Sequence, residues 1–211
     1  MSSETGNDGL GVALLAGGAS ARMGTNKALL RAHPGSPTMI EGVVARLGEA
    51  GLAPHLLVTN TPSTFAFLGI PMQPDDIPGA GPLGGIYTAL HHLPYERTLM
   101  VGCDMPLLNA GLLRYMAGLP PGADVLVPRW TGAGGSSNVE TLHAIYSRRC
   151  IEPMRRRIEA GRLKVQALLD EVSVRYVEEA EMRRHDPELE SFRNANTPGE
   201  WEWLRGRLQA D

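Results

Sequence analysis

The chain has 211 residues, 43% hydrophobic and 20% charged, with a formal net charge of -3. These values favour one globular domain over residues 1–211, with neither a basic field for nucleic acid nor an apolar run that would span a membrane. Two cysteines are too few for a disulfide framework. Residues 1–10 lack the apolar stretch of a signal peptide, so we expect a cytoplasmic location and a disordered segment over residues 1–9.

A strand followed by a glycine loop is the first informative feature. Gly11–Ala16 is apolar on both faces, which is typical of a buried parallel strand. Gly17 and Gly18 have no Cβ, so their backbone N–H groups can approach an anion, and Arg22 and Lys27 add two positive charges. The segment therefore predicts a triphosphate-binding loop. It matches neither the Walker spacing nor the dinucleotide fingerprint G-x-G-x-x-G.

The rest of the chain alternates between strand and helix patterns. Further strands are expected at residues 55–59, 98–103, 124–128, 142–146 and 172–177. Helices are expected at residues 40–47, 64–68, 86–93, 109–119, 151–160 and 165–169, and from residue 198 with Thr197 as N-cap. Residues 130–138 are expected to be a mobile loop, and 178–191 a charged surface segment. This alternation predicts an α/β domain with helices covering a mostly parallel sheet.

Polar residues follow several of these strands, at the edge where an open α/β sheet binds its ligands. Asn60 follows the second strand, where its amide can bind a base or a ribose. Asp104 follows the strand at residues 98–103. Mg²⁺ often takes one or two carboxylates together with substrate phosphates, so Asp104 is the candidate metal ligand. The alternative is that Asp104 only stabilises a turn.

A second glycine-rich segment, residues 79–85, precedes a helix. Its backbone could hydrogen-bond a base without large side chains, or it could be an ordinary tight turn. Asp75 and Asp76 stand before it, either as a nucleotide contact or as a solvated turn. His91 and His92 lie on the helix with no third ligand in register, so we expect them at the surface or partly buried.

Four motifs together resemble one family. The run Leu15-Ala16-Gly17-Gly18, with Arg22-Met23-Gly24 and Lys27 after it, resembles the signature L-A-G-G-x-x-x-R-M-G-x-D-K of the molybdenum cofactor guanylyltransferases. Asn26 departs from it, since Asp is usual there. Two further matches are C-D-x-P at residues 103–106 and G-P-L-x-G at residues 81–85. The fourth is N-x-N-T-P-E-E at residues 194–200, where Gly199 replaces the first Glu.

The resemblance covers residues 11–204 and implies a three-layer, Rossmann-like nucleotidyltransferase fold. It implies transfer of GMP from GTP to the phosphate of the molybdopterin cofactor, with release of pyrophosphate, and catalytic roles for Arg22, Lys27 and Asp104, with Mg²⁺ on Asp104. The nucleotide-binding residues that it implies are Leu15, Ala16, Gly17, Gly18, Lys27, Asn60 (or Thr59), Asp76, Gly81, Pro82, Leu83 and Asp104. The acceptor-binding residues that it implies are Asn194, Asn196 and Lys164, with Arg162 as the alternative to Lys164.

Other functions remain open at this point. The related cytidylyltransferases tend to carry L-A-A-G where this chain has Leu15-Ala16-Gly17-Gly18, so the presence of a second glycine favours guanine over cytosine. A non-catalytic nucleotide-binding module would have little use for Arg22, Lys27 and Asp104 together, and a hydrolase would need a nucleophile–base pair. We expect GTP and the molybdopterin cofactor as partners, with proteins of molybdopterin synthesis or target molybdoenzymes as further candidates, and a monomer.

Overall fold

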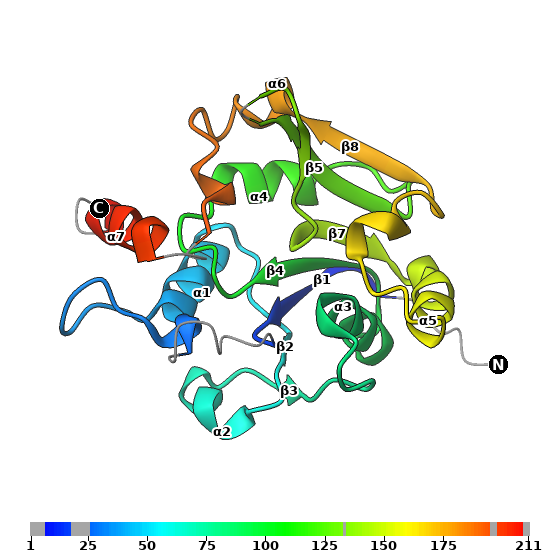
Figure 1. The fold of residues 1–211 in the computed structure, drawn as a ribbon, viewed down its shortest axis with the longest axis horizontal. Coiled ribbons are helices and arrows are strands. Elements are labelled where there is room, and N and C mark those ends of the chain that lie inside the picture. The colour runs from blue at the N-terminus through cyan, green and yellow to red at the C-terminus, as the bar shows by residue number, and fades with distance from the viewer. Residues whose placement is uncertain (1–6, 18–25, 133, 195–197, 209–211) are drawn as a thin grey trace.

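The computed structural model describes residues 7–17, 26–132, 134–194 and 198–208. Over these residues, eight strands form one sheet with helices on both faces (Figure 1). The strands are β1 (Asn7–Leu15), β2 (Leu56–Val58), β3 (Met72–Gln73), β4 (Tyr95–Gly102), β5 (Val125–Thr131), β6 (Ser137–Val139), β7 (His143–Ser147) and β8 (Val174–Glu178). Their order in the sheet is β3-β2-β1-β4-β7-β5-β6, and β8 pairs with β5 beside this path.

The sheet is mostly parallel, as predicted. Strands β3, β2, β1 and β4 pair in parallel, and so do β5 and β8. Strand β7 is antiparallel to both β4 and β5, and β6 is antiparallel to β5. The connection from β5 to β6 is too short for the crossover that a parallel pair requires, which explains the reversal there.

Helices separate the strands. The α-helices are α1 (Met39–Glu49), α2 (Pro62–Phe65), α3 (Gly81–His92), α4 (Ala110–Ala117), α5 (Ile151–Glu159), α6 (Glu179–Met182) and α7 (Pro198–Leu208). The 3₁₀ helices are η2 (Lys27–Leu29), η3 (Ala66–Leu68), η4 (Arg148–Cys150), η5 (Val165–Leu168) and η6 (Glu190–Phe192). Asn109 caps α4 as predicted, because its side-chain oxygen accepts a hydrogen bond from the Leu112 N–H at 3.0 Å.

Strand β1 shows why both faces of the sheet are covered. Val12 and Leu14 belong to the core cluster that includes the apolar faces of α1 and α4. Ala13 and Leu15 belong to the cluster on the other face, with α3 and α5. Because successive side chains of a strand point to opposite faces, an apolar run such as β1 is buried on both sides. The predicted three-layer architecture is confirmed.

Three stretches differ from the prediction. Residues 7–9, which we expect to be disordered, extend β1, and Asn7 pairs with Tyr95 of β4. Within the loop expected at residues 130–138, the ends form a hairpin instead, in which Trp130 of β5 pairs with Asn138 of β6. Helix α3 begins at Gly81, so part of the glycine-rich segment is already helical.

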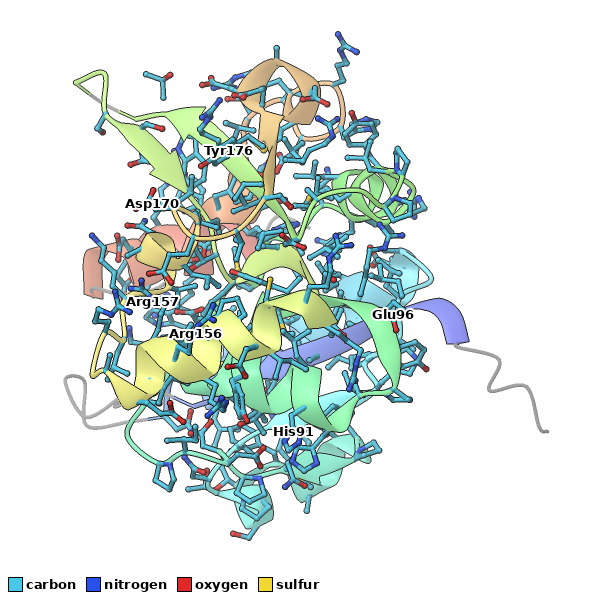
Figure 2. All side chains as sticks on the ribbon, turned by 90° about the vertical axis from the view of Figure 1, so that its right-hand side faces the viewer. His91, Glu96, Arg156, Arg157, Asp170 and Tyr176 are labelled. Carbon is cyan, nitrogen blue, oxygen red and sulfur yellow. The ribbon has the colours of Figure 1, made fainter. Side chains whose placement is uncertain are left out.

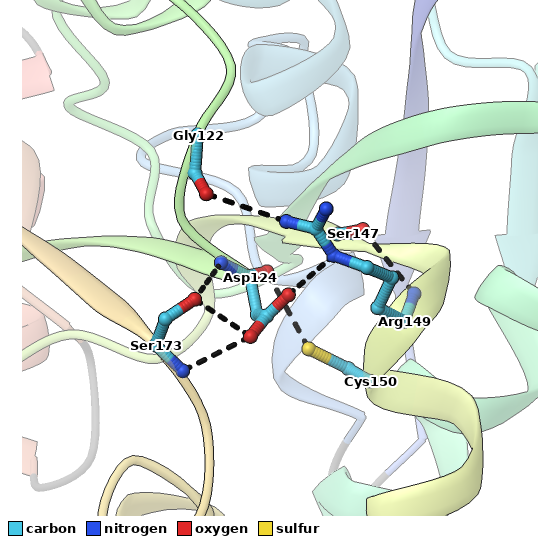
Figure 3. A network of polar contacts seen from close by, with 6 residues as sticks. All are labelled: Gly122, Asp124, Ser147, Arg149, Cys150 and Ser173. Atoms are coloured by element: carbon cyan, nitrogen blue, oxygen red, sulfur yellow. Dashed lines mark hydrogen bonds and ion pairs between the residues drawn. The ribbon is translucent and has the colours of Figure 1, made fainter.

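The Asp124 side chain hydrogen-bonds to the segments next to β7 and β8, and Asp124 itself lies next to β5 (Figure 3). Its Oδ2 accepts hydrogen bonds from the backbone N–H and the hydroxyl of Ser173, at 3.0 and 2.6 Å, just before β8. Its Oδ1 accepts one from Arg149 Nε at 2.5 Å, in η4 after β7. Asp124 itself directly precedes β5, so one carboxylate fixes the relative position of β5, β7 and β8.

His143 in β7 is buried, and neither ring nitrogen hydrogen-bonds to any residue that the structure describes. Its ring packs against Phe192, with the centroids 5.2 Å apart. Burial lowers the pKa of His143 to about 4, although the charge of Asp186 acts in the opposite direction. His143 is therefore neutral in the folded protein at pH values where it would be charged in the unfolded chain.

This burial makes stability depend on pH. In the unfolded chain His143 takes up a proton below a pH of about 6.5, while the folded state resists protonation, so stability is lost as the pH falls from there towards 4. We expect His143→Leu to unfold at a similar temperature to the wild type at pH 7.5 and at a higher one at pH 5, as measured by circular dichroism. Parallel pH profiles for the two proteins would contradict this.

Candidate functional site

The parallel strands end in register, which aligns the residues that follow them. Leu15, the last residue of β1, pairs with Val58 of β2 and with Gly102 of β4. Val58 in turn pairs with Gln73, the last residue of β3. Two positions beyond these four residues, in the order β3, β2, β1 and β4, stand Asp75, Asn60, Gly17 and Asp104. The sheet therefore lines up four candidate residues along the edge where α/β proteins bind ligands.

The start of the glycine loop is held by its neighbours. The Ala16 N–H donates to the Val58 carbonyl at 3.0 Å, and the Leu15 carbonyl accepts from the Cys103 N–H at 3.2 Å. The Leu15 side chain is buried against α3. These bonds set the position from which Gly17 and the loop continue. Two of the predicted residues, Gly18 and Arg22, lie outside the described residues.

The carboxylates of the adjacent residues Asp75 and Asp76 point in different directions. Asp75 faces the glycine loop: a Cβ built on Gly17 would lie 3.8 Å from its Oδ2. Asn60 Nδ2 donates to the same oxygen at 2.7 Å, and Asn60 Oδ1 accepts from the Asp75 N–H at 3.0 Å. The Asp76 carboxylate instead binds two histidines of α3. Asp75, not Asp76, is therefore the carboxylate that stands beside Gly17 and Asn60.

The predicted base-binding segment forms the first turn of α3. Gly81 and Pro82 are exposed, whereas the Leu83 side chain is buried in the core. A Cβ on Gly85, one turn further, would lie 3.8 Å from Asp75 Oδ1. The N-terminal turn of α3 thus borders the same space as Asp75, and its free N–H groups favour hydrogen-bond acceptors.

Asn26 has a local role that explains its departure from the family motif. Its side-chain oxygen accepts a hydrogen bond from the Ala28 N–H at 3.2 Å, which caps the turn η2 that begins at Lys27. Asp and Asn cap helical turns about equally well, so the substitution preserves the position of Lys27. Lys27 is close enough to Asp104 for its charge to offset part of the rise that burial causes in the pKa of that carboxyl.

Asp104 has a second carboxylate as its neighbour, which the sequence did not indicate as a site residue. Burial raises the pKa of Asp104, and a backbone hydrogen bond and Lys27 act in the opposite direction. Burial also raises the pKa of Glu140, and the charge of Asp104 raises it further, although a hydrogen bond from the Leu142 N–H (2.9 Å) lowers it. The cause of this proximity is the antiparallel pairing of β4 with β7, since Asp104 follows β4 and Glu140 precedes β7. One-dimensional sequence patterns carry no signal for such a contact.

Asn194 joins this group, whereas Lys164 lies elsewhere. The Asn194 side chain hydrogen-bonds to Glu140, and its Oδ1 is buried and accepts no hydrogen bond from the described residues. Lys164 is exposed and precedes η5, which packs on the face of α3 and α5. Helix α7, which follows Asn194, packs instead on Met39 of α1 through Leu204, and α5 and α7 lie at opposite sides of Figure 1. The predicted acceptor residue Asn196 lies outside the described residues.

A cavity of about 460 Å³ adjoins Asn194. It lies between the segment after η6 and helix α7, and its lining consists of Phe192, Arg193, Asn194, Gly199, Glu200 and Trp203. The Arg193 guanidinium lies over the Trp203 ring, 5.1 Å from its centroid. The cavity thus offers aromatic faces and a cation, and Asn194 connects it to Glu140 and Asp104.

The donor set around Asp104 suits a divalent cation. Nucleotidyltransferases typically depend on a divalent metal. The carboxylates of Asp104 and Glu140 offer hard oxygen atoms to a cation. Burial and the charge of Asp104 raise the pKa of Glu140, and a cation would offset the repulsion by Asp104. Carboxylate oxygens without soft ligands favour Mg²⁺ or Mn²⁺.

Known proteins share this architecture. The model of the MobA-like NTP transferase domain matches residues 12–177. A protein of Pelotomaculum thermopropionicum named "Probable molybdenum cofactor guanylyltransferase" is 36% identical over 94% of this chain and 92% of its own length. The "Molybdenum cofactor guanylyltransferase" of Desulfosudis oleivorans is 31% identical over 93% of this chain and 95% of its own.

Solved structures of other proteins have the same fold as this chain. The molybdopterin-guanine dinucleotide biosynthesis protein A of Archaeoglobus fulgidus superimposes with a TM-score of 0.79 and 25% identity, over 96% of this chain and all of the other. At 11% identity, the 4-diphosphocytidyl-2C-methyl-D-erythritol synthase of Anaerococcus prevotii has the same fold, with a TM-score of 0.71 over 96% of both chains.

The fold and the named relatives together define a nucleotidyltransferase. Within that class, the chain belongs to the MobA-like NTP transferase family, together with the molybdenum cofactor guanylyltransferases. The predicted family and enzyme class are confirmed. Among the described residues, no helix is both long and apolar enough to cross a membrane.

The pairing of Asp104 with Glu140 predicts a cost in stability. A carboxyl whose pKa is raised by folding destabilises the folded state once the pH rises through that pKa, because ionisation is easier in the unfolded chain. We expect Glu140→Gln to raise the melting temperature at pH 7.5 in a chelator-containing buffer, and the gain to vanish near a pH of about 4, where the carboxyl is protonated in both states. A lower melting temperature at pH 7.5 would contradict the prediction.

Proposed function

We propose that this chain transfers GMP from GTP to the terminal phosphate of the molybdopterin cofactor and releases pyrophosphate. The family supports this reaction, because the relatives are named as molybdenum cofactor guanylyltransferases. The observation that carries the proposal is the row of Asp75, Asn60, Gly17 and Asp104 at matched positions beyond four parallel strands. This row supplies a nucleotide-binding edge with a metal-binding carboxylate at one end.

The reaction is an in-line displacement at the α-phosphorus of GTP. An oxygen of the acceptor phosphate forms the new P–O bond, and the bond from the α-phosphorus to the oxygen bridging it to the β-phosphorus breaks. That bridging oxygen leaves with pyrophosphate. The attacking phosphate is already ionised, so no general base is required, and catalysis rests on positioning and on charge neutralisation.

Each part of the row has a role in this proposal. Gly17, with Gly18, offers backbone N–H groups to the phosphates, and Lys27 and Arg22 neutralise the triphosphate and the departing pyrophosphate. Asn60 and Asp75, together with the first turn of α3, hold the nucleoside, and the exposed backbone at Gly81 and Pro82 is available to the base. We assign to Asp75 the nucleotide contact that the family resemblance implied for Asp76.

Mg²⁺ held by Asp104 and Glu140 would neutralise charge on the α-phosphate. Lys27 lies near Asp104, so its charge and that of the cation would act on the same phosphates. Glu140 is hydrogen-bonded by Asn194, which also lines the neighbouring cavity. This chain of contacts supports the cavity as the acceptor site, with the Arg193 guanidinium, which lies over the Trp203 ring, as its cation.

The same contacts support one catalytic domain, since strands from both halves of the chain contribute to the site, and the monomeric state stays a prediction. Guanine as the base rests on the glycine pair Gly17-Gly18, because the cytidylyltransferases tend to carry Ala-Gly there. The protein partners from molybdopterin synthesis or among molybdoenzymes, the acceptor role of Lys164 and the cytoplasmic location stay predictions.

Pyrophosphate release tests the donor and the chemistry. With Mg²⁺ and the molybdopterin cofactor, we expect release from GTP to exceed release from ATP, CTP and UTP. Lys27→Ala should lower kcat by about 100-fold or more, because a charge that stabilises the transition state is lost. Its circular dichroism spectrum should match that of the wild type.

The matched control is Arg156→Ala, which removes an exposed cation on α5 (Figure 2) and should keep wild-type turnover. Faster release from CTP than from GTP would overturn the donor assignment. Wild-type turnover by Lys27→Ala would overturn the catalytic assignment.

Asp75 and Asp76 can be separated by kinetics. Asp75→Asn removes the charge beside Gly17, and we expect the KM for GTP to rise by about tenfold, which is about 1.4 kcal/mol of binding free energy. Asp76→Asn should raise KM less, because its carboxylate faces α3. Steady-state kinetics at saturating acceptor makes the comparison, and a larger effect of Asp76→Asn would reverse the assignment.

A further inference from the structure

Three metal-ligating side chains that the proposed reaction does not use meet on the surface of α3. Asp76 Oδ2 lies 2.8 Å from His91 Nδ1, and Asp76 Oδ1 lies 2.8 Å from His92 Nε2. The three ligand atoms, one from each residue, lie within 4.8 Å of one another. His91 is at the surface of the molecule in Figure 2.

Helix geometry brings these groups together. Thr88, His91 and His92 are spaced at i, i+3 and i+4, so they share one face of α3. The Asp76 N–H donates to Thr88 Oγ1 at 3.0 Å, and that hydroxyl donates to the Gly84 carbonyl at 2.9 Å. The Asp76 backbone is therefore fixed to the helix independently of its carboxylate. The same fixation aims the carboxylate at the two imidazoles.

The chemistry of the three groups fits a transition metal. Two imidazole nitrogens and a carboxylate oxygen suit Zn²⁺, Co²⁺ or Ni²⁺, whereas Mg²⁺ prefers an all-oxygen set. Burial would raise the pKa of Asp76, but the hydrogen bonds of His91 and His92 lower it, so the carboxylate is ionised and ready to bind a cation. Each imidazole now shares a proton with one carboxylate oxygen, and a cation would occupy that same space.

Binding a metal ion would require little movement of these three ligand atoms. A tetrahedral shell with bonds of about 2.1 Å separates its ligand atoms by about 3.4 Å. The side chains of His91, His92 and Asp76 are 55%, 36% and 22% exposed, so they can rotate by this amount. The exposed side leaves a coordination position for water.

We propose that Asp76, His91 and His92 bind one divalent transition-metal ion, of which Zn²⁺ is the representative, with water completing the shell. This site is separate from the carboxylates Asp104 and Glu140. The bound ion would join the segment before α3 to the end of that helix. Asp75 directly precedes Asp76 and contacts Asn60, so the ion would also stiffen one wall of the nucleotide site. This consequence rests on the proposed function.

Cobalt titration of the full chain, free of any affinity tag, tests the site. Co²⁺ is added in saturating Mg²⁺, which occupies the all-oxygen site at Asp104 and Glu140. We expect one equivalent of Co²⁺ to produce visible d–d absorption, which Zn²⁺ abolishes by displacement. His91→Ala, His92→Ala and Asp76→Asn should each weaken Co²⁺ binding by about 100-fold or more, since each removes a direct ligand.

The matched control is His33→Ala, because His33 is an exposed histidine whose Nδ1 contacts the Pro34 carbonyl and not a carboxylate. It should bind Co²⁺ as the wild type does. Metal-free circular dichroism establishes that each variant is folded. Identical titrations of the wild type and His91→Ala would overturn the proposal and leave a hydrogen-bonded contact only, and equal loss in His33→Ala would show adventitious binding. Neither result depends on turnover with GTP.

Discussion

The matched register of β1 with β2 and β4 is the constraint on which the site depends. Parallel pairing places Leu15 level with Val58 and Gly102, so the residues beyond these strand ends emerge side by side. The row requires no long-range side-chain recognition, since the backbone ladder sets it. A register shift of one residue would exchange the two faces of β1 and bury the wrong side chains in both cores. Stability of the sheet and alignment of the site are therefore the same requirement.

At the Asp104 end of this row of strand ends, the negative charges of Asp104 and Glu140 are poorly compensated. Asp104 and Glu140 approach each other in a partly buried setting, and Lys27 offsets only part of the cost to Asp104. Such strain is typical of sites that bind cations and phosphates, where the missing charge arrives with the substrate. Asn194 extends the polar group towards the cavity beside α7, so the proposed nucleotide and acceptor sides meet at Glu140.

The segment after β3 divides its two carboxylates between different tasks. Asp75 continues the row at the sheet edge, and Asp76 faces α3 and its two histidines. Asn60 binds both the carboxylate and the N–H of Asp75 and so holds this residue at the sheet edge. The Thr88 hydroxyl then fixes the choice, because it binds the Asp76 N–H. Two adjacent acidic residues with different partners can thus evolve separate functions on one short segment.

The sequence alone determined the layered α/β fold, the family and the glycine loop, because apolar runs, glycines and short motifs are local patterns that survive without coordinates. It also located Asp104 and Asn60, since both follow recognisable strands. Tertiary structure decided what local patterns cannot encode. The antiparallel return of β7 brought Glu140 to Asp104, Asp75 and not Asp76 came to lie beside Asn60 and Gly17, and the face of α3 joined Asp76 to His91 and His92. Each of these contacts joins residues at least fifteen positions apart, and their partners are chosen by the packing of the sheet and its helices, not by neighbours in the chain.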